Sequence, residues 1–235
     1  MTYFERFHQR LLDKQQDVRA RPVTYVAFGD SVTQGCMEYG VIEHEQVYHH
    51  FLKQHIVNQY PSTILNVINA GVSGDTAVNS EQRWHRDLVA YNPDLITLAF
   101  GVNDCHQGRA GLKPYLKAID KLIGIISRQT EADLLVLTPS MMMSRDNLHI
   151  HPQDRGVLPR FTETAESGYL QMYVDELRMY LDKEKIPYFD VYEMWEQMKQ
   201  AGKDVHERLA NGINHPDRAF HAELGEQLYK YLSDD

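Results

Sequence analysis

Four residues at widely spaced positions have the chemistry that acyl transfer requires. Ser31 closes an apolar run at residues 23–28, Gly74 lies in a glycine-rich turn, Asn103 follows a later apolar run, and His215 precedes the last helical pattern. A serine nucleophile needs a base to take its proton and donors aimed at the developing oxyanion. Ser31 and His215 are therefore the candidate nucleophile and base. The N–H groups of Ser31 and Gly74 and the amide of Asn103 are the candidate oxyanion donors.

These four residues can meet only if the segments before them belong to one sheet. Apolar runs typical of buried strands alternate with patterns of helical period, and the runs cover residues 23–28, 63–69, 94–100, 134–138 and 187–191. Crossover helices cover both faces of such a sheet and make its strands parallel. We therefore expect a single three-layer α/β/α domain over residues 1–235, with a flavodoxin-like sheet of about five strands in the order 2-1-3-4-5. The carboxyl ends of its strands then share one edge, where ligands bind.

Composition excludes several other classes of protein. The chain has 24 Lys and Arg against 33 Asp and Glu, a net charge of −9, which argues against nucleic acid or an anionic membrane as partner. Residues 1–21 carry charges throughout and lack the apolar core of a signal peptide. The two cysteines, Cys36 and Cys105, have neither disulfide-framework nor metal-site spacing. We expect a cytoplasmic enzyme whose partner is a small-molecule ester; the sequence leaves its oligomeric state open.

The residues around the four candidates resemble the SGNH, or GDSL, hydrolases. The similar blocks read GDSV at 29–32, NAGVSGD at 69–75, GVND at 101–104 and NHP at 214–216. They occur in the order of the family and span nearly the whole chain. The resemblance implies a flavodoxin-like fold, ester hydrolysis through an acyl-serine, and neither a metal nor an organic cofactor. The positions that match the four letters of the family name are Ser31, Gly74, Asn103 and His215.

One position departs from the family pattern. The family usually has an aspartate three residues before the histidine, where this chain has Gly212. Asn211 is one residue further back and is the candidate for orienting the His215 ring. An amide oxygen or a backbone carbonyl can accept from the ring Nδ1–H, but neither stabilises an imidazolium as well as a carboxylate does. Asp204 and Asp217 are less favoured candidates, because a surface charge and a helix cap are simpler roles for them.

The segment at residues 139–160 has no clear period and is long for a loop in a compact domain, which indicates a binding loop or lid. Met141, Met142 and Met143 lie just after the fourth predicted strand. Thioethers fill irregular gaps, so these three side chains could line an acyl pocket, and a place in the core is an equal alternative.

Two histidines in the same segment, His149 and His151, could bind a metal, but no third ligand stands at a suitable spacing. We therefore interpret them as residues of a polar loop.

The expected reaction is hydrolysis of a carboxylic ester, with a small acyl group such as acetyl on a sugar favoured over a lipid chain. A thioesterase or lysophospholipase would use the same centre. The missing aspartate leaves open a catalytically silent module that binds an acylated or glycosylated ligand. A flavodoxin-like nucleotide binder is disfavoured, because the chain has no G-x-G-x-x-G motif and no Walker lysine.

Overall fold

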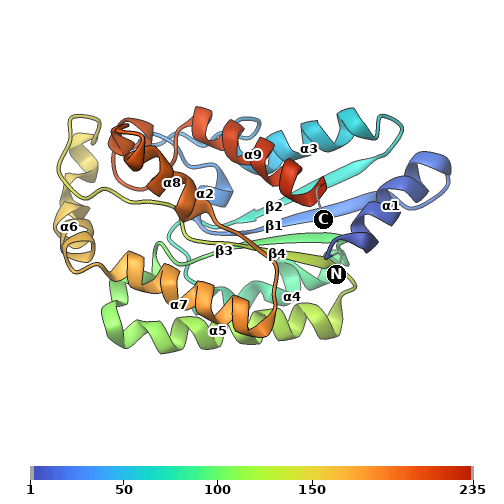
Figure 1. Cartoon of the computed structure of the whole chain (residues 1–235), viewed down its shortest axis with the longest axis horizontal. Helices are drawn as coiled ribbons and strands as arrows, with labels where there is room; N and C mark the ends of the chain where they lie inside the picture. The colour runs from blue at the N-terminus through green and yellow to red at the C-terminus, as the bar shows by residue number, and fades with distance from the viewer. Residues whose placement is uncertain (1–2, 234–235) are drawn as a thin grey trace.

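A computed structural model describes residues 3–233 and contains a five-stranded parallel sheet at its centre (Figure 1). The strand order is β2-β1-β3-β4-β5, which confirms the predicted topology. The strands are β1 (Val23–Gly29), β2 (Leu65–Gly71), β3 (Leu95–Ala99), β4 (Asp133–Leu137) and β5 (Tyr188–Phe189).

Helices cover both faces of the sheet. The α-helices are α1 (Glu5–Gln16), α2 (Ser31–Gln34), α3 (Tyr48–Gln59), α4 (Trp84–Asp87), α5 (Gly108–Gln129), α6 (Leu158–Glu166), α7 (Tyr169–Glu184), α8 (Val191–Gln200) and α9 (Arg218–Ser233). Helices α3 and α9 lie side by side over one face, and α5 and α7 lie over the other (Figure 1). The apolar faces of these helices and both faces of the inner strands form one continuous core.

The strand register brings three carboxyl ends to one line across the sheet. Gly29 at the end of β1 is the partner of Gly71 on β2 and of Ala99 on β3. β1 is buried on both faces, with only Thr24 partly exposed, so its register is determined by packing on both sides. The segments that follow these three strands therefore begin next to one another.

The structure also contains elements that the hydrophobic pattern did not predict. Residues 187–191 form only a two-residue strand, because the Asp190 carboxylate accepts from the Glu193 N–H at 3.0 Å and starts helix α8. Part of the expected loop at 139–160 is helical, with the 3₁₀ helix η4 (Pro152–Val157) leading directly into α6. No helix within residues 3–233 is both long enough and apolar enough to cross a membrane.

Candidate active site

Ser31 is held by a tight turn between β1 and α2. It is the first residue of α2 and is 3% exposed, and the Asp30 side chain caps the helix by accepting from the Val32 N–H at 3.0 Å. Gly29 is required at the turn, since a Cβ there would lie 2.3 Å from Thr33 Oγ1 and 2.7 Å from the Ala99 carbonyl oxygen. The tight turn between β1 and α2 therefore fixes the position of the Ser31 hydroxyl at the carboxyl edge of the sheet.

His215 and Ser31 meet across 184 residues of sequence. His215 Nε2 lies 3.1 Å from Ser31 Oγ, and His215 Nδ1 lies 3.0 Å from the carbonyl oxygen of Met37. A carbonyl oxygen can only accept, so Nδ1 carries the hydrogen and Nε2 is left to accept from the serine hydroxyl. The pair thus has the tautomer that a general base needs.

The Met37 carbonyl is itself fixed in position. The Met37 N–H donates to the Val41 carbonyl at 3.0 Å, which closes the turn after α2. Arg218, at the start of α9, binds Glu38 at 2.7 Å and Glu43 at 2.8 Å on either side of that turn. Arg218 follows His215 by three residues, so its ion pairs hold the turn of Met37 against the segment that carries His215.

Asn211 does not contact the ring in the way the sequence predicted. Its Oδ1 accepts from the backbone N–H groups of Ile213, Asn214 and His215 at 2.9, 2.9 and 3.0 Å. This oxygen therefore orders the loop that carries His215, and the Met37 carbonyl takes the place beside the ring. A backbone acceptor has no side-chain signature, which is why the sequence could not identify it.

Gly212 shows why an aspartate is absent from its usual position. Its φ of 70° lies in the left-handed region, and a Cβ there would come 2.5 Å from Asn147 Oδ1 and 3.0 Å from the Ile150 N–H nitrogen. Asn147 Nδ2 in turn donates to the Gly212 carbonyl at 2.7 Å. The 139–160 segment packs so closely on this loop that a side chain at position 212 does not fit.

The two nearby carboxylates are engaged elsewhere. Asp204 bonds to His206 Nδ1 at 2.8 Å and to Arg145, and Asp217 accepts from Arg208 Nε at 2.9 Å and caps α9. His206 Nε2 lies 3.3 Å from Ser144 Oγ, which imitates a triad. The lone pair of His206 Nε2 also accepts from the Ser144 N–H at 3.2 Å. Because that lone pair is already used by the backbone, His206 is a poor base for the Ser144 hydroxyl.

Burial keeps His215 neutral. Removal from water lowers the pKa of the imidazole, while the hydrogen bond to Met37 and the negative charge of Asp154 oppose that shift. A neutral imidazole at physiological pH can accept the serine proton without first losing one of its own.

The predicted oxyanion donors belong to three connected segments. Ser31 begins a helix, so its N–H has no partner within that helix, and Gly74 is an exposed turn residue with φ of 74°. Asn103 Nδ2 donates to the Asp75 carbonyl at 2.9 Å, and Gln34 Oε1 accepts from the Ser73 N–H at 2.6 Å. The turn around Gly74 is therefore tied on one side to the helix of Ser31 and on the other to Asn103.

A cavity of about 340 Å³ lies against His215. The 139–160 segment and α6 contribute Asp154, Val157 and Phe161 to its wall. Met141, Met142 and Met143 are absent from the lining and are 5%, 3% and 0% exposed within the apolar core, which favours the core alternative over a pocket role for these methionines. Asp154 and Val157 belong to η4 and Phe161 belongs to α6, and the hydrophobic patterns of these two short helices were too short to recognise in the sequence.

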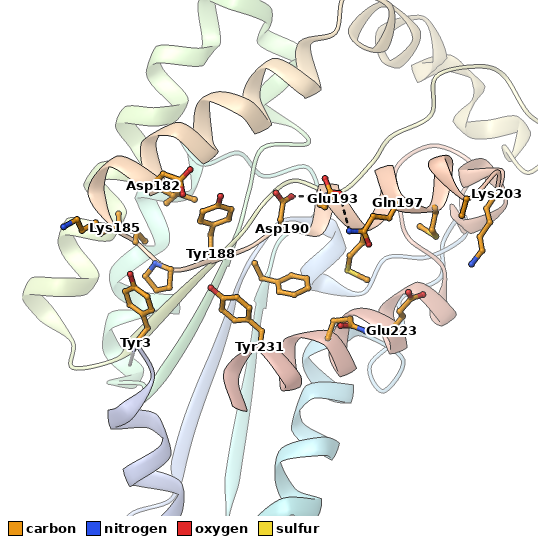
Figure 2. Close-up of a pocket in the computed structure, with 18 residues that line it drawn as sticks. Tyr3, Asp182, Lys185, Tyr188, Asp190, Glu193, Gln197, Lys203, Glu223 and Tyr231 are labelled. Carbon is orange, nitrogen blue, oxygen red and sulfur yellow. Dashed lines mark hydrogen bonds between the residues drawn. The ribbon is translucent and has the colours of Figure 1, made fainter. Parts of the chain in front are cut away.

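A larger cavity of about 840 Å³ lies outside the edge strand β5 and is shown in Figure 2. Its wall includes Tyr188, Asp190, Glu193 and Tyr231, and Asp190 is already bonded to Arg178 at 2.7 Å. None of the four residues predicted for acyl transfer lines it. Size therefore does not identify the reactive site in this molecule.

The structure also locates the histidines and cysteines considered for other chemistry. Within residues 3–233 no three His, Cys, Asp or Glu side chains form a group that could hold a metal. His151 caps η4 and stacks on Tyr39 with ring centroids 4.3 Å apart. Cys36 and Cys105 are buried free thiols.

Comparison with protein families then decides the classification. Residues 27–223 match the model of the GDSL-like lipase/acylhydrolase family. The chain belongs to this family. Membership confirms the resemblance drawn from the four sequence blocks and makes the protein a carboxylic ester hydrolase.

Individual relatives of this GDSL-family chain include acetyl esterases. An acetylxylan esterase from Geobacillus stearothermophilus is 38% identical over 45 residues, which cover 19% of this chain and only 20% of the relative. A crystal structure of a catalytic mutant of an acetylxylan esterase from the same organism has a TM-score of 0.66 at 16% identity and covers 89% of this chain and 94% of that one. A lipase/acylhydrolase from Enterococcus faecalis has a TM-score of 0.64 at 20% identity, with 90% and 96% covered. These structural similarities establish the shared fold.

Proposed function

We propose that this GDSL-family chain removes small acyl groups, in particular acetyl, from carbohydrate esters through an acyl-enzyme. The observation that carries this proposal is the hydrogen-bonded series from Ser31 Oγ to His215 Nε2 and from His215 Nδ1 to the Met37 carbonyl, at 3.1 and 3.0 Å. A serine paired with an oriented imidazole is the basic unit of nucleophilic ester hydrolysis.

The reaction has two halves. Ser31 Oγ attacks the ester carbonyl carbon while His215 Nε2 takes the hydroxyl proton, and the C–O bond to the alcohol breaks as the imidazolium returns that proton to the leaving oxygen. Water then attacks the acyl-serine with His215 as base, which releases the acid and restores the hydroxyl. The developing oxyanion is stabilised by the N–H groups of Ser31 and Gly74 and by the Asn103 amide.

The cavity beside His215 supports a sugar as the alcohol. Its lining includes the polar side chains of Gln34, Glu38 and Ser73 and the phenol ring of Tyr39, which is 48% exposed and has one face stacked on His151. Aromatic faces and polar groups together suit a sugar ring, which is apolar on its faces and polar at its edge. Acetylxylan esterases among the similar proteins support the same substrate class.

A longer acyl group is the second candidate, as in a thioesterase or lysophospholipase. Val41, Ile42 and Val157 line the same cavity and are 37%, 46% and 45% exposed, which is apolar surface that an acyl chain could cover.

Rates on matched esters test the proposal. We expect the enzyme to release acetate from acetylated xylooligosaccharides and to cleave 4-nitrophenyl acetate faster than the octanoate, and we expect Ser31→Ala to abolish both activities. Preference for the octanoate would favour the second candidate. Activity that survives in Ser31→Ala would refute the assigned centre.

A further inference from the structure

Arg83, at the end of the 3₁₀ helix η1 (Asn79–Arg83), is a buried cation directly behind the catalytic edge. It is 5% exposed, and its guanidinium lies over the Phe28 ring at 4.1 Å from the centroid. Nη2 donates to the Gly29 carbonyl at 3.0 Å and Nη1 donates to the Ala70 carbonyl at 2.8 Å. One side chain therefore joins the carboxyl ends of β1 and β2.

The same guanidinium also holds the turn that carries the oxyanion donors. Arg83 Nε donates to Asp75 Oδ2 at 2.7 Å, and Asp75 is 8% exposed. Asp75 directly follows Gly74, and its backbone carbonyl accepts from Asn103 Nδ2 at 2.9 Å. Asp75, the acid of this ion pair, is therefore the direct sequence neighbour of Gly74 and the hydrogen-bond partner of Asn103.

Arg83 is suited to this place by its shape as well as its charge. Its planar group sends separate donors to a carboxylate and two carbonyls in fixed directions, whereas a lysine ammonium is a single compact charge at the end of a flexible stem. Removal of the guanidinium would leave a buried carboxylate and two buried carbonyls without this partner. The turn would then shift to reach other donors.

We propose that Arg83, acting through Asp75, is a positioning residue that holds the Gly74 N–H and the Asn103 amide where the oxyanion forms. This inference rests on the proposed function. Displacement of a catalytic group by about 1 Å can cost about 10²-fold in rate, and loss of one oxyanion donor costs about 10²–10³-fold. Substrate binding before reaction does not depend on these donors to the same degree.

The test compares Arg83→Lys and Arg83→Met with a matched variant, Lys14→Met. Lys14 is likewise buried, at 3% exposed, and binds the Val18 and Ala20 carbonyls at 2.6 and 2.9 Å, but it lies on α1, at the end of the sheet where the strands begin (Figure 1). With 4-nitrophenyl acetate we expect both Arg83 variants to lose about 10–100-fold in kcat with KM within about threefold. Lys14→Met should lose thermal stability and keep kcat within about twofold.

A double variant separates positioning from general damage to the fold. If Arg83 acts through Asn103, Arg83→Lys combined with Asn103→Ala should lose much less than the product of the two single losses in kcat. If Arg83→Lys does not fold, Asp75→Asn replaces it in the cycle with Asn103→Ala, since it removes the charge that pairs with Arg83 while it keeps an acceptor oxygen.

Three results would contradict the inference. The first is a folded Arg83→Lys enzyme with kcat within about twofold of wild type. The second is a double variant whose loss in kcat equals the product of the two single losses. The third is a loss of kcat in Lys14→Met as large as that in the Arg83 variants. If the Ser31→Ala variant hydrolysed the ester at the wild-type rate, the proposed function would be refuted, and the inference with it.

Discussion

The His215 ring is oriented by a neutral group. In a Ser-His-Asp triad the carboxylate both fixes the tautomer and stabilises the imidazolium in the transition state. The Met37 carbonyl, 3.0 Å from Nδ1, can do the first and offers only a dipole for the second. Asn211 and Gly212 shape the loop so that His215 reaches this carbonyl.

Neutralising the nearby carboxylates should therefore have little effect on rate. We expect Asp204→Asn and Asp217→Asn to keep kcat/KM within about tenfold of wild type, a loss of about 1.4 kcal/mol or less in transition-state stabilisation. His215→Ala should abolish hydrolysis. Steady-state kinetics on 4-nitrophenyl acetate, with circular dichroism to verify folding, measures both effects. A collapse of several orders of magnitude in either aspartate variant would mean that a carboxylate completes a triad.

The pH dependence of kcat/KM tests the role of His215 independently. Burial lowers the His215 pKa below its ordinary value of about 6.5, and only the neutral imidazole accepts the serine proton. The value of kcat/KM should therefore fall as the pH drops through that lowered pKa and should exceed half of its plateau at pH ~6.5. A midpoint above pH ~6.5 would instead show that a negative charge stabilises the imidazolium.

At the scale of elements, the long buried strands and the polar residues at their ends were predictable, while shorter features were not. The apolar run of β1 and the three blocks after β1, β2 and β3 correctly placed the carboxyl edge of the sheet. Helix α6 was missed because few of its positions are buried, Phe161 and Thr164 being the ones that contact the interior fully. Hydrogen bonds to backbone groups, such as that of Met37, depend on chain geometry that residue types do not encode.

Helix α6, and not the methionine run, should control acyl-chain length. Phe161 lines the cavity beside His215, so Phe161→Ala should enlarge it and raise the ratio of kcat/KM for butanoate over acetate by about tenfold. Met142→Ala is the matched control, expected to lose about 2–5 kcal/mol in free energy of unfolding with that ratio unchanged. Rates on 4-nitrophenyl esters and urea unfolding measure the two outcomes. The reverse pattern would restore the pocket role of the methionines.

At the scale of the whole molecule, the catalytic edge contains two buried carboxyl groups, Asp30 and Asp104, whose ionisation costs stability. Burial raises the pKa of both Asp30 and Asp104 to about 7, although each carboxylate accepts from a backbone N–H. The native state thus binds protons that the unfolded chain, with a carboxyl pKa of about 3.9, has released. The stability contributed by the protonated Asp30 and Asp104 is complete below pH ~4 and is lost as the pH rises through ~7.

Asp104→Asn should remove one of these two groups from the titration. Each group can change the free energy of unfolding by at most about 1.4 kcal/mol per pH unit, so the variant should match wild type near pH ~4 and become the more stable protein toward pH ~8. Its amide oxygen can still accept from the Ala77 N–H, which lies 3.0 Å from Asp104 Oδ1. Thermal melts from pH 4 to 8 measure the difference. A constant difference between the two proteins across this range would show that Asp104 is ionised throughout.

If the catalytic assignment is correct, Ser31 is the one serine of the chain that reacts as a nucleophile. Labelling with a fluorophosphonate followed by peptide mapping measures this directly, because the reagent forms a stable adduct with an activated serine hydroxyl. We expect one adduct per chain, on Ser31, and none in the His215→Ala variant. Modification at Ser73, at Ser140 or at Ser144 beside His206, with Ser31 unmodified, would contradict the Ser31–His215 centre.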